Sequence, residues 1–96
     1  DFNKVNEDGK TPLYWACFYG HLQIATLLLE QGANVNKVNK DGKTPLLIAL
    51  ESRNLEVVKL LIKKGANLDK VDQYSEDLLY VVSRKGHLDI VKFFIE

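Results

Sequence analysis

The stretch Gly9-Lys10-Thr11-Pro12-Leu13 is the most informative part of this chain, because it returns unchanged 33 residues later as Gly42-Lys43-Thr44-Pro45-Leu46. The triplet Gly32-Ala33-Asn34 returns at the same interval as Gly65-Ala66-Asn67. A fixed period of about 20 to 50 residues is typical of a solenoid, in which each unit buries its apolar face against its neighbours. Such a fold offers a long surface rather than a pocket, so the repeat indicates that the protein binds other molecules rather than catalysing a reaction.

The composition of the 96-residue chain is that of an ordinary globular protein, with 46% hydrophobic and 27% charged residues. Its 13 basic and 13 acidic residues cancel, so it lacks the positive field that nucleic acid or an anionic membrane attracts. No apolar run approaches the roughly 20 residues of a membrane-spanning helix. The single cysteine, Cys17, cannot form an internal disulfide, so we expect an intracellular protein, located in the cytoplasm or the nucleus.

One unit of the repeat spans residues 6–38 and is expected to contain two short helices. Thr11 and Pro12 begin the first helix, because a threonine hydroxyl caps free N–H groups and proline fits the first helical position. This helix ends near Gly20, and a second helix covers residues 22–31. Helices of two to three turns are unstable alone, so packing between units must hold them.

Three motifs of this unit resemble the ankyrin repeat family: Gly9-Lys10-Thr11-Pro12-Leu13, Gly20-His21-Leu22 and Gly32-Ala33-Asn34-Val35-Asn36. The family's histidine after Thr-Pro-Leu is replaced by Tyr14 in this unit and by Leu47 in the next. The resemblance implies an all-α solenoid of stacked helix-turn-helix units with short hairpin-like loops.

The whole chain, residues 1–96, is interpreted as a single domain cut from a longer array. Its expected parts are the tail of a preceding repeat (1–5), repeat one (6–38), repeat two (39–71) and a divergent, incomplete repeat three (72–96). In repeat three Asp77 replaces the capping threonine and Val82 replaces the small alanine. An aspartate can also cap a helix, so the helix start should survive.

The chain contains no motif of an active site. His21 and His87 lie two periods apart, so a structural role in capping the second helices is the simpler interpretation. Cys17 follows the apolar face of the first helix and is expected to be buried and inert. We therefore expect no enzyme activity, catalytic residue, cofactor, metal or small-molecule substrate.

The resemblance implies that a partner protein binds the concave side, through the turn tips and the outer positions of each first helix. The positions that it indicates are Glu7, Asp8, Lys10, Phe18 and Tyr19 in repeat one, Lys40, Asp41, Lys43, Glu51 and Ser52 in repeat two, and Gln73, Tyr74, Glu76, Arg84 and Lys85 in repeat three.

Two adjacent aromatic residues, Phe18 and Tyr19, stand out among these positions, because both cannot point into one core and aromatic side chains commonly anchor interfaces. The alternative is that one of them packs beneath the loop of the adjoining unit. Trp15 is expected to belong to the core or to packing between units. The sequence thus predicts a non-catalytic protein–protein interaction module. The alternatives are a targeting or regulatory repeat domain of a larger enzyme, and a structural adaptor or tether.

Overall fold

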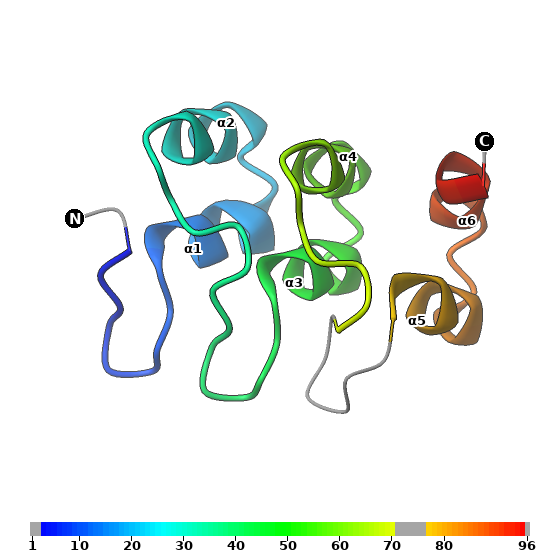
Figure 1. Ribbon diagram of the computed structural model, residues 1–96, viewed down its shortest axis with the longest axis horizontal. Coiled ribbons are helices and arrows are strands. Elements are labelled where there is room, and N and C mark those ends of the chain that lie inside the picture. Colours follow the sequence, from blue (N-terminus) through cyan, green and yellow to red (C-terminus); the bar gives the residue numbers. More distant parts are fainter. Residues whose placement is uncertain (1–2, 71–76, 96) are drawn as a thin grey trace.

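The computed structural model describes residues 3–70 and 77–95, and these residues form helices without any strand. The helices are α1 (Pro12–Tyr19), α2 (Leu22–Glu30), α3 (Pro45–Glu51), α4 (Leu55–Lys63), α5 (Leu78–Lys85) and α6 (Leu88–Ile95). They form three helix pairs stacked along one direction (Figure 1), and this confirms the all-α repeat architecture.

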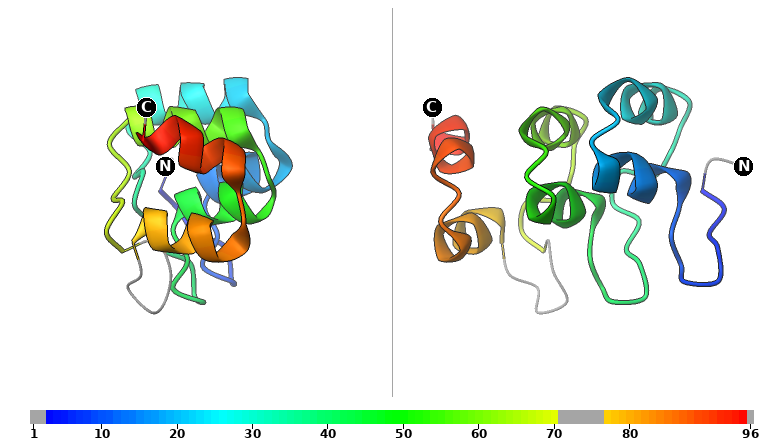
Figure 2. Two further views of the ribbon diagram at one scale, coloured as in Figure 1. Left: turned by 90° about the vertical axis from the view of Figure 1, so that its right-hand side faces the viewer. Right: turned by 180° about the vertical axis from the view of Figure 1, so that it is seen from behind.

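The helices are arranged in two layers, with α1, α3 and α5 in one layer and α2, α4 and α6 in the other (Figures 1 and 2). The turns before α1 and α3 project from the first layer, away from the second. The first helices therefore lie between the turn tips and the second helices, and this places α1 and α3 beside the projecting turns.

The start of each first-layer helix is fixed by the capping residue that the sequence predicted. The Thr11 hydroxyl accepts a hydrogen bond from the backbone N–H of Tyr14 at 3.1 Å, and Thr44 accepts the equivalent bond from Leu47 at 3.2 Å. In the divergent third unit the Asp77 carboxylate accepts the bond from Tyr80 at 2.8 Å. The substitution of threonine by aspartate thus preserves the cap.

The turns are held by asparagine side chains at equivalent positions. Asn6 Oδ1 accepts hydrogen bonds from the backbone N–H groups of Asp8 and Lys10, each at 3.0 Å. Asn39 Oδ1 accepts the same pair of bonds in the next turn, from Asp41 at 2.9 Å and from Lys43 at 3.0 Å. The tips of these two turns are therefore tied down locally, so their charged side chains project from a defined backbone.

The core runs between the helix pairs. The predicted face of α1, made of Leu13, Ala16 and Cys17, is buried, and α3 is buried along almost its whole length because it has helices on both sides. The two helices of each pair pack against each other, and the first two pairs are joined by α1 against α3 and by α2 against α4, whereas α5 and α6 pack mainly against each other. Val82, which replaces the alanine of the other units, is fully buried on α5.

Candidate protein-binding surface

Four aromatic side chains of α1 form one cluster, which we call the aromatic ladder: Tyr14, Trp15, Phe18 and Tyr19. Side chains four residues apart lie above one another on a helix. Accordingly the rings of Tyr14 and Phe18 stack nearly parallel, with centroids 6.1 Å apart, and those of Trp15 and Tyr19 stack at 6.0 Å. Edge-to-face contacts join the two stacks, for example between Phe18 and Tyr19 at 5.0 Å.

The ladder occupies the part of α1 that the buried stripe leaves free, so its rings remain accessible to solvent. Phe18 is 42% exposed and Tyr19 is 63% exposed. A neighbouring loop therefore does not cover Tyr19. Phe18 lies beside Asn39, Asp41 and Lys43 of the adjoining turn, so for Phe18 the alternative of packing beneath that loop stays open. An exposed group of contiguous aromatic rings is uncommon on a soluble protein and is typical of an interaction site.

Trp15 is 37% exposed, so it is not part of the core that the described residues form, and its packing between units stays a prediction. Its counterparts one and two periods later, Ile48 and Val81, are buried, and Ile48 faces the preceding helix pair.

A lysine from the first turn extends over the ladder. The Lys10 ammonium lies 5.1 Å from the ring centroid of Tyr14 and 5.1 Å from that of Trp15. Both distances are within the range of a cation–π interaction. Lys10 thus joins the turn tip to the ladder, and the faces of these rings accept a cation.

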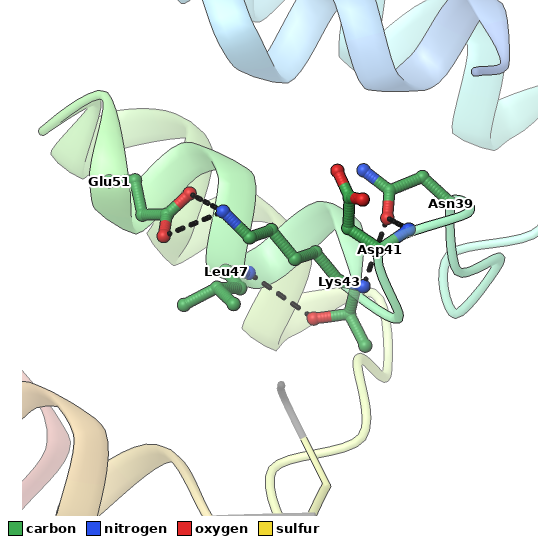
Figure 3. Close-up of polar contacts among 6 residues, drawn as sticks. Asn39, Asp41, Lys43, Leu47 and Glu51 are labelled. Carbon is green, nitrogen blue, oxygen red and sulfur yellow. Dashed lines mark hydrogen bonds and ion pairs between the residues drawn. The ribbon is translucent and has the colours of Figure 1, made fainter. Parts of the chain in front are cut away.

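A cavity of about 220 Å³ separates the ladder from the second unit. The cavity is lined by Tyr14, Phe18, Asn39, Asp41, Lys43, Ile48, Glu51 and Ser52. The Lys43 ammonium donates to both carboxylate oxygens of Glu51, at 3.1 and 3.2 Å, and Figure 3 shows this pair beside the turn that Asn39 holds. The structure thus brings four predicted binding residues of unit two to the edge of the aromatic ladder.

The end of α1 is fastened to the second unit by Asn54, a residue that the sequence analysis did not single out. The Asn54 side-chain amide donates to the backbone carbonyl of Cys17 at 2.8 Å and to that of Phe18 at 3.4 Å. Gly20 ends α1 with a φ of 73°, and a Cβ atom there would lie 2.7 Å from Asn54 Oδ1. Glycine is therefore favoured at this position both for its left-handed backbone and for the close approach of Asn54.

The other predicted binding residues are distributed along the stack. Glu7, Asp8, Lys40, Asp41, Glu51, Arg84 and Lys85 are exposed, Lys10, Lys43 and Ser52 are partly buried, and Gln73, Tyr74 and Glu76 lie outside the described residues. Glu7 and Asp8 do not line the cavity, and Arg84 lies beside Tyr80 on α5, with its guanidinium carbon 5.9 Å from that ring. The structure therefore gathers one group of these residues, at the contact between units one and two.

Cys17 and His21, which the sequence analysis singled out, both lie at the ends or faces of helices in the first unit. Burial raises the pKa of the Cys17 thiol to about 12, so this cysteine remains a protonated, weakly reactive thiol. His21 occupies the N-cap position of α2, as its repeated place in the sequence predicted, but its side chain makes no capping hydrogen bond, and its ring lies 6.0 Å from Tyr19. Within residues 3–70 and 77–95, no group of three or more metal-binding side chains is gathered.

Sequence comparison agrees with this architecture. A family model that describes ankyrin repeats in three copies matches residues 1–72, which is three quarters of the chain. The chain belongs to the ankyrin repeat family. The match ends before α5, and the third helix pair of this ankyrin chain is the one in which the sequence departs furthest from the repeat.

Two relatives share a single repeat-length segment with this ankyrin chain. One is the Acyl-CoA-binding domain-containing protein 6 homolog of Dictyostelium discoideum, which is 58% identical over 33 residues, or 34% of this chain and 12% of the relative. The other is the Putative ankyrin repeat protein R96 of Acanthamoeba polyphaga mimivirus, which is 49% identical over 35 residues, or 36% of this chain and 3% of the relative. The matched segments are thus small parts of much longer proteins.

Ankyrin repeats generally serve as protein–protein interaction modules. Across the described part of this ankyrin chain, each helix is too short or too polar to cross a lipid bilayer.

Proposed function

We propose that this ankyrin domain is a non-catalytic, intracellular protein-binding module whose partner lies across the concave side of the stack. Ankyrin domains are typically non-catalytic, and the observation that supports binding here is the aromatic ladder. The partner covers the exposed rings of Phe18 and Tyr19 at the centre of the interface and meets the turn tips at its rim.

The energetic reason is that desolvated aromatic rings contribute more to binding than exposed charges. Truncating a central aromatic anchor commonly costs about 2 kcal/mol or more. Charged side chains at a rim alter the association rate and contribute less to affinity, since water and salt screen them. Because Lys40 is exposed at a turn tip, we assign it to the rim.

A second candidate function is a targeting or regulatory repeat domain attached to a domain of another kind. The Dictyostelium relative favours it, because its name records an acyl-CoA-binding domain in a protein that also contains a segment similar to this chain. Both candidates use the same binding surface. They differ in whether the bound partner changes the activity of a neighbouring domain in the full-length protein.

The test measures the affinity of a partner captured with the full-length protein for three variants. Phe18→Ala combined with Tyr19→Ala should weaken binding by about thirtyfold or more, whereas Lys40→Ala should change it by less than about fivefold. Lys63→Ala combined with Lys64→Ala, at the end of α4 in the other layer, serves as the surface control. Unchanged affinity in the aromatic variant, with the fold intact by circular dichroism, would refute the proposal.

A further inference from the structure

The cavity between the ladder and the second unit combines two kinds of wall. Tyr14 and Phe18, whose rings are nearly parallel, line it from α1, and the acidic residues Asp41 and Glu51 line it from the second unit. Small-molecule sites usually enclose about 300–1,000 Å³. At about 220 Å³, this cavity is below that range, so its size suits one side chain of a bound polypeptide.

Two lysines of the chain already contact lining residues, although Lys10 itself does not line the cavity. The Lys10 ammonium lies over the Tyr14 ring, and the Lys43 ammonium binds both oxygens of Glu51. The Asp41 carboxylate is different: within the described residues it takes part in no hydrogen bond or ion pair, and in Figure 3 no dashed line reaches it. With two carboxylates and one ammonium, the cavity retains a net negative charge.

We propose that this cavity binds an arginine side chain of the partner polypeptide, an inference that rests on the proposed function. The guanidinium would pair with Asp41 and lay its plane along the face of Phe18. Arginine fits better than lysine because its planar group stacks on aromatic rings while its N–H groups donate to a carboxylate, whereas an ammonium is a compact, strongly hydrated charge. The three aliphatic carbons of arginine would contact Ile48 and the ring edges.

The experiment titrates the ¹⁵N-labelled chain with the peptide acetyl-Gly-Arg-Gly-amide and follows the backbone amide signals. The control peptide replaces arginine with citrulline, which keeps the shape of the side chain and removes its charge. We expect saturable shifts at Asp41, Glu51 and Ser52 with the arginine peptide, and at least about fivefold weaker binding of the citrulline peptide.

Three variants separate this site from general charge attraction. Asp41→Asn should weaken arginine binding by about fivefold, whereas Asp8→Asn, at the same place in the preceding turn but outside the cavity, should leave it unchanged. Lys43→Gln should strengthen binding by a few-fold, because it removes the competing cation from Glu51.

Equal binding of the arginine and citrulline peptides, or equal effects of Asp41→Asn and Asp8→Asn, would overturn the inference. Shifts confined to other parts of the chain would also overturn it. In those cases the aromatic variants could still lose their protein partner, so the proposed function and the arginine site can fail separately.

Discussion

Replacing Gly20 with alanine tests how the first unit is joined to the second. Gly20 and Gly86 end equivalent helices with nearly identical φ values, 73° and 74°. A Cβ atom at Gly20 would lie 2.7 Å from Asn54 Oδ1, whereas a Cβ at Gly86 would meet nothing within 4 Å. The two substitutions therefore share the backbone strain and differ in the contact with Asn54.

The expected losses of stability follow from the backbone strain and from the contact with Asn54. Left-handed backbone strain at alanine costs about 1–2 kcal/mol, part of which is offset because alanine has less entropy to lose on folding than glycine. Gly86→Ala should therefore lower the free energy of unfolding by about 1 kcal/mol. Gly20→Ala should also displace the Asn54 side chain and break its 2.8 Å bond to Cys17, which adds about 1 kcal/mol.

The assay is urea denaturation followed by circular dichroism, applied to a double-mutant cycle of Gly20→Ala and Asn54→Ala. Once Asn54 is truncated, Gly20→Ala has no side chain to displace, so the two effects should fall short of additivity by about 1 kcal/mol. Additive effects in the cycle, or equal losses for Gly20→Ala and Gly86→Ala, would show that the Asn54 contact does not hold the two units together.

Four further predictions concern stability. Arg53 has a φ of 58° at the position of Gly20 and Gly86, so Arg53→Gly should raise the free energy of unfolding by about 0.5–1 kcal/mol; a loss in urea denaturation would contradict this. Leu61 is fully buried, and Leu61→Ala should lower the free energy of unfolding by about 2–5 kcal/mol. An unchanged urea midpoint would contradict the placement of this face of α4 in the core. Burial lowers the pKa of His87 below 6.5, and the Arg53 cation lowers it further, so the unfolded chain takes up this proton at a higher pH than the folded chain. The urea midpoint should therefore fall as the pH drops below about 6.5 through the folded-state pKa, and His87→Asn should flatten this dependence; an equal slope in the variant would refute it. Amide hydrogen exchange should be faster in α5 and α6 than in α3 and α4, because the third helix pair packs less closely on the stack; equal protection would contradict this.

The helix pattern could be predicted from the sequence because local chemistry sets it. Thr11, Thr44 and Asp77 each cap a helix with their own side chain, and the glycine at position 20 ends one through its backbone. These signals depend on neighbours within about four residues, so they can be recognised without knowledge of the tertiary structure.

The candidate surface could be predicted only in part, because it depends on how units meet. The adjacency of Phe18 and Tyr19 indicated exposure, and the aromatic residues at 14 and 15 would have revealed the full ladder through their spacing of four. The bond of Asn54 to Cys17 joins residues 37 positions apart, and the Lys43–Glu51 pair joins a turn to a helix end. The first contact depends on the distance between stacked units and the second on how a turn lies against α3 within one unit, and no local pattern specifies either arrangement.

The most direct test of the central claim is hydroxyl-radical footprinting of the full-length protein with and without a captured partner. Phe18 and Tyr19 should lose most of their side-chain oxidation in the complex, because the partner covers the aromatic ladder. Ile24 and Leu27, which are 51% and 59% exposed on α2 in the other layer, serve as internal controls and should react equally in both states. Protection of Ile24 and Leu27 with unchanged oxidation of Phe18 and Tyr19 would contradict the account.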